Sequence, residues 1–374
     1  MRSLLATTLL AVISSPCLAQ NQGLKLINGV DTHIDVKYDK SLVPQSGITL
    51  EAWVTYDGST LQSGWRWPTI ARQNPVPQQE SFLLRVDAGT ASNTAIKWFV
   101  RTSGNHAHAT WNFTAGQLKA WTHIAGTYDG AFARIFVNGL EVAKAAGSGT
   151  ILDAGNVLRI GNGDLSSQGA ETWNGEIDEV RLWPVARDGA EIQSMMKLDL
   201  QRCPGEVSTW NLNGDAKDSS ATNHGSRQGQ VTFANNTLLL QKTPFAGALG
   251  FGGSTVGCNG APLAGISALP KVGNTNFAVT CIRATRTGTG ALMLSAAGRT
   301  SPLPLLGAKV WIDPITALAI PAQGDPLAAS KTAVPIPNSP WLGSQAFYCQ
   351  YFWIESGCKV PLFASDGLTI SIYP

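Results

Sequence analysis

Short runs in which every second residue is apolar recur between residues 24 and 183, and they predict β-strands. In the run 48–54, Ile48, Leu50 and Val54 fall on one face of an extended chain. Similar runs occur at 82–86, 96–100, 121–129, 133–137, 140–145, 157–160 and 177–183. Asn138-Gly139 separates two of them and predicts a tight hairpin, because a type I′ turn needs positive φ at both central residues.

A single helix is predicted directly after these runs. Asp188 can cap its first turn and Glu191 stands three residues later, the spacing of a capping box. Ile192, Met195 and Met196 then form an apolar stripe. Many short strands with one late helix favour an all-β fold, a jelly-roll sandwich.

The length of 374 residues predicts two domains. From about residue 241 the chain becomes rich in Gly and Pro, with strands expected at 277–282, 291–295, 309–312, 347–354 and 368–372. We therefore expect a first domain at 20–201, a linker or partial-repeat hairpin at 202–240, and a smaller β-sandwich at 241–374.

The first 19 residues have the pattern of a signal peptide. Arg2 precedes the apolar stretch 4–13, and cleavage is expected near Ala19. Cys17 fits a lipoprotein signal poorly, because Ser-Ser-Pro precedes it. No stretch is long and apolar enough to span a bilayer. The sequence therefore predicts a secreted, extracellular or periplasmic protein.

Charge excludes one class of partner. Charged residues make up 14% of the chain, the net charge is +2, and no basic run occurs. Nucleic-acid binding needs a clustered basic surface, so we expect none.

Five cysteines remain if Cys17 leaves with the signal peptide, and an oxidising compartment favours two disulfides among the last four. The sequence does not fix the pairing. Cys349–Cys358 would close a short hairpin loop, Cys258–Cys281 would then pair, and Cys203 would be left over. A zinc site is the weaker alternative, because no C-x₂-C pair occurs.

Five segments carry a family resemblance through their order along the chain. They are ITLEAWV (48–54), WTHIAGTYDG (121–130), RIFVNGLEVA (134–143), LRIGNG (158–163) and GEIDEVRLW (175–183), followed by the helix. Together they resemble the laminin-G-like jelly-roll family of the concanavalin-A-like superfamily over about residues 24–198. The resemblance implies two stacked antiparallel sheets, one of them concave, with carbohydrate or protein ligands and often a bound calcium. Residues 336–352 resemble a β-sandwich module at the C-termini of some exported bacterial proteins, which implies no function.

The resemblance also implies a structural Ca²⁺ site at Asp178, an aspartate in a late strand. Calcium takes six to eight oxygen ligands, many of them backbone carbonyls. The turn at Asn28, Gly29 and Asp31 could supply them. In the alternative interpretation Asp178 only accepts turn hydrogen bonds.

Glycoside hydrolases on this fold use a strand of the type Glu-x-Asp-x-x-Glu, and 176–181 begins in that way. Their chemistry needs two carboxylates about 5.5 Å apart. The second Glu would fall at Val180 or Arg181, and Glu179 is expected on the face opposite Asp178. We therefore predict that the protein is not an enzyme.

Loop aromatics are the candidate ligand platform. Trp65, Arg66 and Trp67 lie between two expected strands, with Asn74 nearby. Sugar rings have apolar C–H faces that stack on flat aromatic rings, so an exposed Trp beside polar groups would suit carbohydrate. Burial of this loop is the alternative.

His106, His108 and Trp111 form a second candidate cluster. A His-x-His pair on a strand places both rings on one face, which suits a metal, but no third ligand is evident. We expect polar rim residues that contact a ligand.

The sequence thus predicts an extracellular binding protein that recognises carbohydrate or a glycosylated surface. An adhesion or structural protein with protein partners is the alternative. A glycoside hydrolase is the weakest hypothesis, because the sequence lacks the required pair of carboxylates.

Overall fold

The structure is a computed structural model. It describes residues 21–45, 47–58, 67–87, 95–114, 116–165, 170–200, 203, 205–219, 223–243, 247–325, 328–358 and 360–374. The predicted signal peptide lies outside these ranges. Within them, no helix is long and apolar enough to cross a membrane.

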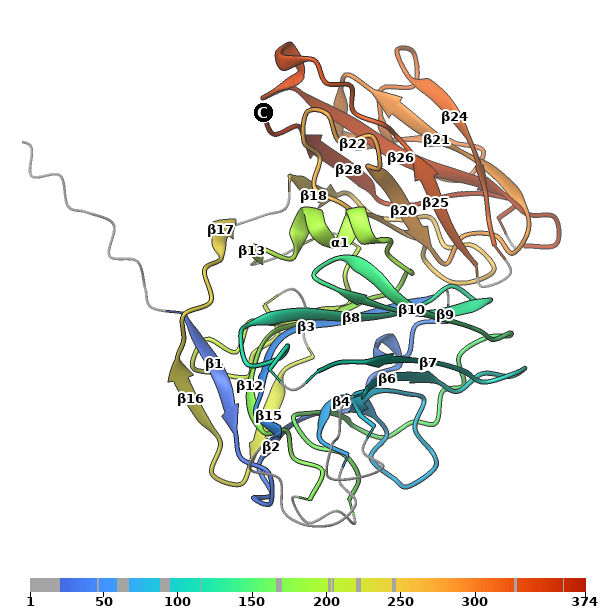
Figure 1. Cartoon of the computed structure of the whole chain (residues 1–374). Coiled ribbons are helices and arrows are strands. Elements are labelled where there is room, and N and C mark those ends of the chain that lie inside the picture. The colour runs from blue at the N-terminus through green and yellow to red at the C-terminus, as the bar shows by residue number, and fades with distance from the viewer. Residues whose placement is uncertain are drawn as a thin grey trace, which may run out of the picture.

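Two antiparallel sheets stack face to face in the N-terminal half (Figure 1). The eight-stranded sheet has the order β10 (Leu140–Ala146), β9 (Phe132–Val137), β8 (Thr122–Tyr128), β3 (Ile48–Tyr56), β12 (Gly175–Trp183), β1 (Gln22–Leu26) and β16 (Thr232–Asn235), and β14 (Ser208–Trp210) also pairs with β12. The seven-stranded sheet has the order β15 (Gly225–Gln228), β2 (His33–Val36), β11 (Leu158–Ile160), β4 (Thr69–Gln73), β5 (Phe82–Val86), β6 (Ala95–Val100) and β7 (Ala107–Asn112).

The apolar alternation seen in the sequence fills the space between these sheets. Leu50, Leu84 and Trp98 are fully buried in one cluster. Gly126 on β8 lies directly under the Trp98 ring, where a Cβ would overlap it. The Asn138-Gly139 hairpin is confirmed, with φ of 50° and 77°. The all-β jelly-roll prediction is therefore confirmed.

Strands from the segment 202–240, predicted to be a linker or hairpin, join both sheets of the jelly roll. β14 pairs with β12, β16 pairs with β1, and β15 pairs with β2. Trp210 and Leu212 are buried in the jelly-roll core. The segment therefore differs from a simple linker, because β15 and β16 pair with the distant strands β2 and β1 and β14 pairs with β12.

The predicted helix is α1 (Gly189–Met195), with the capping box of Asp188 and Glu191 in place. A short 3-10 turn, η1 (Lys40–Leu42), precedes β3. After α1, β13 (Leu198–Leu200) pairs in parallel with β17 (Gln241–Thr243).

The C-terminal strands form further antiparallel sheets. One has the order β18 (Ala248–Phe251), β28 (Gly367–Ser371), β26 (Ala346–Ile354), β21 (Thr289–Ser295) and β24 (Leu318–Gln323), with β27 (Leu362–Ala364) on β26. The others are β19 (Leu263–Ile266), β20 (Ala278–Ile282) and β25 (Ala329–Ala333), and the hairpin β22 (Gly298–Leu305) and β23 (Ala308–Ile312). A 3-10 turn, η3 (Pro340–Leu342), lies before β26. We call residues 247–374 the C-terminal sandwich.

The core of the C-terminal sandwich continues into the N-terminal half. Trp183 and Met195 belong to the same buried cluster as Phe277, Tyr351 and Trp353. Figure 1 shows α1 and β13 between the jelly-roll sheets and the C-terminal strands. The halves share a packed boundary, and their division into separate domains stays a prediction.

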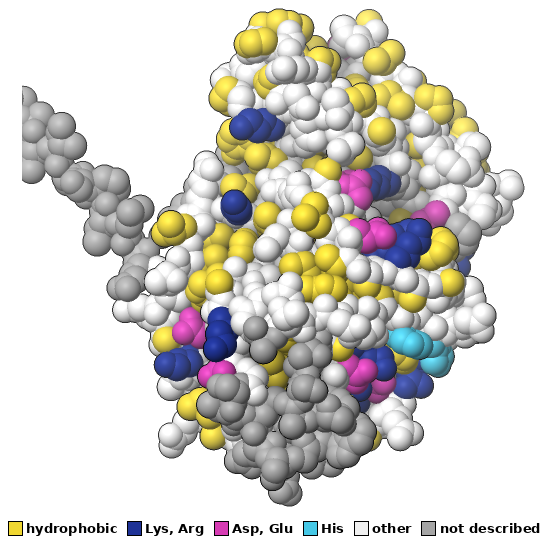
Figure 2. All heavy atoms as spheres, in the orientation of Figure 1, with side chains coloured by type: hydrophobic (Ala, Val, Ile, Leu, Met, Phe, Trp, Pro, Cys, Tyr) yellow, Lys and Arg dark blue, Asp and Glu magenta, His cyan; other side chains and the backbone are white. Residues whose placement is uncertain are grey.

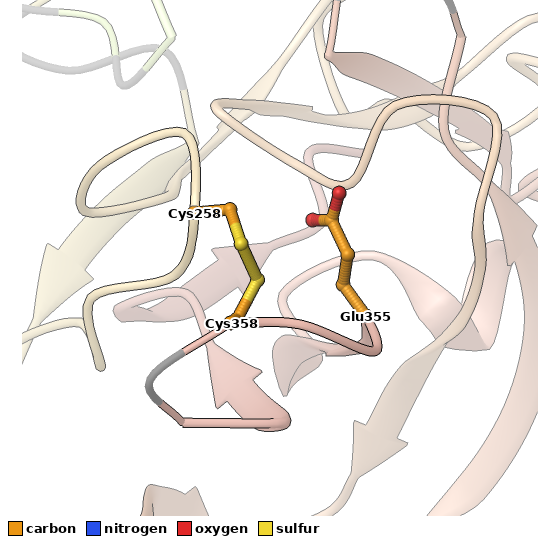
Figure 3. A group of neighbouring side chains, drawn as sticks. All are labelled: Cys258, Glu355 and Cys358. Carbon is orange, nitrogen blue, oxygen red and sulfur yellow. A yellow bond between two sulfur atoms is a disulfide. The ribbon is translucent and has the colours of Figure 1, made fainter.

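One disulfide joins Cys258 to Cys358 (Figure 3). The expected partners Cys281 and Cys349 are instead buried as thiols, so the predicted pairing is wrong. Both lie in the interior on the strands β20 and β26, and burial raises the pKa of each thiol. The disulfide forms because the loop between β18 and β19 meets the loop between β26 and β27, and sequence spacing does not reveal that contact.

Candidate functional site

The outer face of the eight-stranded sheet is covered by other parts of the chain. Trp53 and Phe136 on this face pack against Ile192 and Met196 of the α1 region and against Leu238. The Trp53 Nε1 also donates to the Met196 carbonyl at 2.6 Å. This face therefore leaves no room for a ligand over β3 and β8.

A β-bulge in β12 changes the direction of its carboxylates. The register with β3 shifts between Asp178 and Arg181, and Glu179 has a φ of +50°. Val180 points into the jelly-roll core, whereas Glu179 bonds to Arg181 on the outer side. The expectation that Glu179 and Asp178 point to opposite faces assumed a regular strand, and the bulge overturns it.

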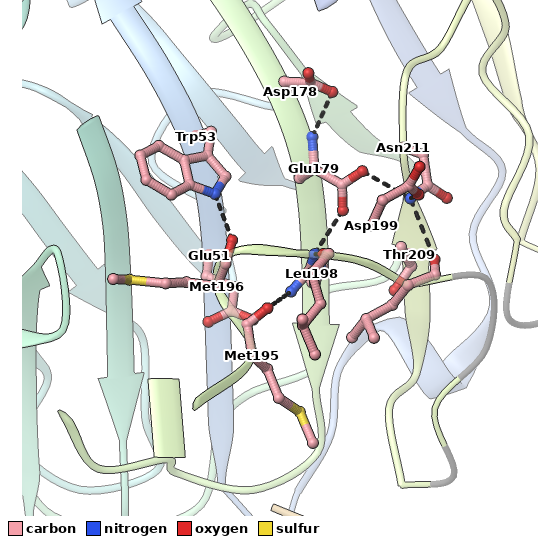
Figure 4. A network of polar contacts seen from close by, with 12 residues as sticks. Glu51, Trp53, Asp178, Glu179, Met195, Met196, Leu198, Asp199, Thr209 and Asn211 are labelled. Atoms are coloured by element: carbon pink, nitrogen blue, oxygen red, sulfur yellow. Dashed lines mark hydrogen bonds and ion pairs between the residues drawn. The ribbon is translucent and has the colours of Figure 1, made fainter. Parts of the chain in front are cut away.

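These carboxylates lie inside a buried polar network (Figure 4). Glu179 accepts from Arg181 Nη2 at 2.6 Å and from Asn211 Nδ2 at 2.7 Å. Burial raises the pKa of Glu179 to about 7, against the opposing attraction of Arg181. Asp178 and Glu179 are at most 1% exposed, so neither can reach a substrate. Asp178 and Glu179 therefore have structural roles, through hydrogen bonds to neighbouring buried groups.

The four residues expected at a calcium site do not converge. In the antiparallel β1–β12 pairing, Leu24 lies opposite Ile177 and Leu26 lies opposite Gly175. Asp178 therefore lies beside the N-terminal end of β1, whereas the turn at Asn28, Gly29 and Asp31 follows its C-terminal end. The Asn28 Nδ2 donates to the Ala170 and Thr172 carbonyls. Because strands rise about 3.3 Å per residue, Asp178 and this turn cannot share one ion.

Asp178 instead gathers two amide side chains. Its Oδ2 accepts from Asn21 Nδ2 at 2.7 Å and from Asn236 Nδ2 at 3.0 Å, and its Oδ1 accepts from the Glu179 N–H. Burial and the neighbouring Glu179 raise the pKa of Asp178 well above its usual value. Asn21 and Asn236 were not predicted from the sequence, because they reach Asp178 only through the pairing of β1 with β12 and β16.

The outer face of the seven-stranded sheet carries aromatic and charged side chains at its β5–β7 end. Arg85, Lys97 and Thr110 lie side by side on adjacent strands, as do Leu83, Phe99 and His108 in the next row. The guanidinium of Arg85 stacks on the Trp67 ring, with Cζ 5.3 Å from the centroid. We call Trp67, Arg85, Lys97, Phe99 and His108 the β5–β7 face.

Ion pairs hold the charged groups of the β5–β7 face in place. Asp87 lies 3.7 Å from Arg85 Nη2 and 3.6 Å from Lys97 Nζ. The side chains of Arg85 and Lys97 remain 17% and 24% exposed, and His108 is exposed. These groups are ordered before a ligand arrives and still reach solvent.

Only some of the residues that the sequence predicted to bind a ligand lie on or beside the β5–β7 face. His106 stacks edge-on against Phe99 at 5.9 Å, and its Nδ1 accepts from the Thr102 N–H. In Figure 2, His side chains lie beside basic and acidic ones at one edge of the view. No group of metal ligands among the described residues includes a His.

Two other predicted residues are structural. Trp111 lies opposite Ile96 in the row that faces the core, so it packs inward. Asn74 is 1% exposed and has a φ of +62°, and its side chain stabilises a turn. Trp65 and Arg66 lie outside the described residues.

Arg85, Lys97 and Phe99 were missed, although the alternation contains the signal. Since Leu84 and Trp98 point inward, residues one position away from them on each strand point outward. If the outward-facing positions of β5 and β6 are treated as one surface, Arg85, Lys97 and Phe99 stand out as neighbours.

A possible metal group, Cys258, Glu355 and Cys358, lies in the C-terminal sandwich with its ligand atoms within 4.8 Å of one another (Figure 3). Both sulfur atoms belong to the disulfide. One carboxylate is left, which is too little to hold an ion.

Comparison with known proteins agrees with this fold. Residues 28–193 match the family described as the concanavalin A-like lectin/glucanases superfamily, in its laminin-G-like form. This part of the chain is therefore a laminin-G-like domain, as the ordered motifs predicted. The match ends before the C-terminal sandwich.

Human pappalysin-1 is 25% identical over 179 residues, which are 41% of this chain and 10% of that protein. The chain thus spans about a tenth of the length of this relative. A candidate carbohydrate binding protein from Bacteroides ovatus is 22% identical over 58% of this chain and 60% of its own, with a TM-score of 0.44. The LG4–5 domains of mouse laminin α1 are 12% identical, covering 100% of this chain and 87% of theirs, with a TM-score of 0.35. Structural likenesses at this level carry no information about ligands.

Proposed function

We propose that the chain is a carbohydrate-binding protein that holds its ligand on the β5–β7 face. The observation that supports this is the pairing of aromatic rings with preordered charged groups on a sheet face that still reaches solvent. The rings of Trp67 and Phe99 offer flat surfaces for the C–H faces of sugars. Arg85, Lys97 and His108 offer hydrogen bonds to hydroxyl or carboxylate groups.

Burial of Asp178 and Glu179 supports a binding role over hydrolysis. A retaining or inverting glycosidase needs two carboxyl groups that flank the scissile bond. Asp178 and Glu179 lie beneath packed side chains, and the β5–β7 face carries Asp87 already engaged by two cations.

The experiment that tests this proposal is a glycan-array screen of the full chain, followed by titration of each hit. Phe99→Ala and Lys97→Ala are expected to weaken binding about tenfold or more, because each removes a contact of about 1.5–3 kcal/mol. Lys25→Ala is the matched control, since Lys25 is an exposed strand lysine on the other sheet. Binding that survives both variants of the face, or a folded chain that binds no glycan, would overturn the proposal and favour protein partners.

Calcium binding is a separate proposal, and Asp178 with Asn21 and Asn236 fits it better than the turn at 28–31. An amide rotated about its last side-chain bond presents oxygen where its nitrogen now lies, and oxygen is what Ca²⁺ takes. The two amide oxygens beside the buried carboxylate would form the centre of a site. If calcium leaves the melting temperature of the chain unchanged, or raises that of Asp178→Asn equally, the proposal fails.

Export is likewise proposed. The Cys258–Cys358 disulfide supports it, since disulfides persist outside the cytosol. Retention of the full-length chain in the cytosol of an expressing cell would count against it.

A further inference from the structure

A cleft of about 490 Å³ lies between the β9–β10 hairpin and the loop that leads into α1. Its walls include Arg134, Phe136, Leu140, Glu141 and Asp188. We call it the β9–β10 cleft. It lies on a different sheet from the β5–β7 face, and none of the ligand-binding or metal residues predicted from the sequence lines it.

We propose that the β9–β10 cleft is a second binding site, which takes a short neutral oligosaccharide. This inference goes beyond the β5–β7 face and does not depend on it. Four observations carry the argument: the fixed shape of the cleft, the ordered polar groups, the pairing of charges, and an exposed apolar wall.

The shape of the cleft is fixed at the hairpin end. A Cβ on Gly139 would overlap the Gln193 side chain, and a Cβ on Gly189 would overlap the Gly139 carbonyl oxygen. The turn of the hairpin is therefore pressed directly against α1. Such contact keeps the two walls apart at a set distance, so the cleft is formed before a ligand binds.

The polar groups of the cleft are ordered by one another. Arg134 Nη1 lies 2.6 Å from Asp129 Oδ2, and its Nε lies 3.4 Å from Glu141 Oε2. Asp129 Oδ1 also accepts the N–H groups of Ala131 and Phe132. Burial favours a higher pKa for Asp129, but these hydrogen bonds and Arg134 outweigh it and lower the pKa. Arg134 is held as a planar donor with its orientation set.

The charges around the cleft are paired with one another, which favours a neutral ligand. Arg134 pairs with Asp129 and Glu141, and Arg187 pairs with Glu51. Lys331 Nζ lies 3.8 Å from Asp188 and forms a shorter ion pair, of 2.6 Å, with Glu191. Lys144 Nζ lies 4.0 Å from the centroid of the Phe132 ring, on which Arg134 also stacks. In Figure 2, basic and acidic side chains alternate where the two halves of the molecule meet. An anion or a cation would gain little here over water.

The remaining wall is apolar and open to solvent. Leu140 is 65% exposed although it lines the cleft, whereas Phe136, which also lines it, is almost fully buried, so Leu140 supplies the open apolar surface. A sugar presents an apolar C–H face and a rim of hydroxyl groups, which matches a leucine wall opposite carboxylates and a guanidinium. The volume lies within the range of roughly 300–1,000 Å³ that small-molecule sites occupy.

A cavity of the C-terminal sandwich shows the contrast. It measures about 410 Å³ and is lined mainly by apolar residues, among them Leu294, Trp341 and Phe347. It offers few groups for hydroxyls, whereas the β9–β10 cleft combines both kinds of contact.

The test uses the full chain, with backbone amides followed by NMR during titration with maltotriose, cellotriose, xylotriose and arabinotriose. At least one of them is expected to shift the amides of 139–141 and 186–189. Leu140→Ala and Glu141→Gln are expected to weaken that binding about tenfold each, from the loss of an apolar contact or a charge-assisted hydrogen bond. Both side chains lie at the surface, so neither change should disturb folding.

Lys97→Ala is the control that separates this inference from the proposed function. It should leave the shifts at 139–141 and 186–189 intact even where it abolishes binding at the β5–β7 face. The charged trisaccharides chitotriosamine and trigalacturonate are titrated for comparison, and if none of the six shifts these amides, the cleft is not a saccharide site. If only chitotriosamine or trigalacturonate does so, the site selects charge and the neutral class is wrong.

Discussion

Arg187 and Glu51 form a fully buried ion pair, with Nη1 of the guanidinium 2.8 Å from Oε1 of the carboxylate. The same guanidinium donates from Nε to the Ser267 carbonyl at 3.0 Å and from Nη2 to the Glu191 carbonyl at 2.5 Å. One side chain therefore ties β3 of the jelly roll to α1 and to the C-terminal sandwich. Burial would raise the pKa of Glu51, but Arg187 and the other charges around it hold that pKa below its usual value.

Removing Arg187 should be costly. Arg187→Ala leaves the Glu51 carboxylate buried without its charge partner, and we expect a loss of about 3–5 kcal/mol in the free energy of unfolding. Urea denaturation measures this. Arg134→Ala is the matched control, because its ion pairs are partly exposed and should contribute less than about 1 kcal/mol. Equal losses for the two variants would contradict the prediction.

Glu206 should make stability depend on pH. Burial raises its pKa to about 7 in the folded state, from an ordinary value of 4.5. The folded state then holds a proton that the unfolded state has released, so stability is present below pH 4.5 and is lost as the pH rises through about 7. The slope for one group reaches at most about 1.4 kcal/mol per pH unit.

Glu206→Gln replaces the titrating carboxyl group with an amide that does not titrate. The unfolding free energy of the variant should therefore fall less between pH 5 and pH 7.5 than that of the wild type. The difference between the two proteins is the quantity to measure, because other groups titrate as well. His123, whose pKa burial lowers to about 4, contributes with the opposite sign over this range. Parallel pH profiles would show that Glu206 is not the group responsible.

The disulfide should be the redox-sensitive element. Cys258 and Cys358 are separated by 100 positions, and removing a link that closes so long a loop should cost about 2–5 kcal/mol. Cys258→Ser should therefore lower the melting temperature to that of the reduced wild type. Cys281→Ser should leave the effect of reductant unchanged, since Cys281 is a buried thiol. Peptide mapping that finds a 258–281 link would refute this.

A chain cut after residue 201 should not fold into a stable jelly roll. It lacks β14, β15 and β16, which pair in both sheets, and it lacks the buried Trp210. A chain cut after residue 240 keeps these strands and should show the steeper, more cooperative urea transition. Two fragments that unfold alike would indicate that the segment 202–240 contributes little.

The sequence predicted the local elements well, because their signals are local. The alternation in 48–54, the Asn138-Gly139 turn and the capping box of Asp188 each act through residues a few positions apart. The ordered motifs also predicted the laminin-G-like domain, because strands with the spacing of that family form the same two sheets.

The candidate site was predicted only in part, because it depends on how strands lie side by side. Asn74 and Trp111 are residue types that often contact sugars, but both have structural roles here. Asn74 is buried in a turn, and Trp111 lies on the inner face of β7. Phe99 and Lys97 belong to the candidate site because β6, which carries them, pairs with β5 on one side and β7 on the other. Side-chain type alone does not reveal such neighbours.

The sequence by itself determined the class of fold, since hydrophobic alternation and turn residues act within a few positions along the chain. Only the tertiary structure decided the disulfide partner of Cys258, the neighbours of Asp178, the place of 202–240 in both sheets, and which side chains share the outer face of β5, β6 and β7. Many of these features depend on contacts between distant residues, such as Asn236 with Asp178, 58 positions apart, or with Asn21, 215 positions apart. Such contacts are set by the packing of whole sheets, and no short stretch of sequence encodes them.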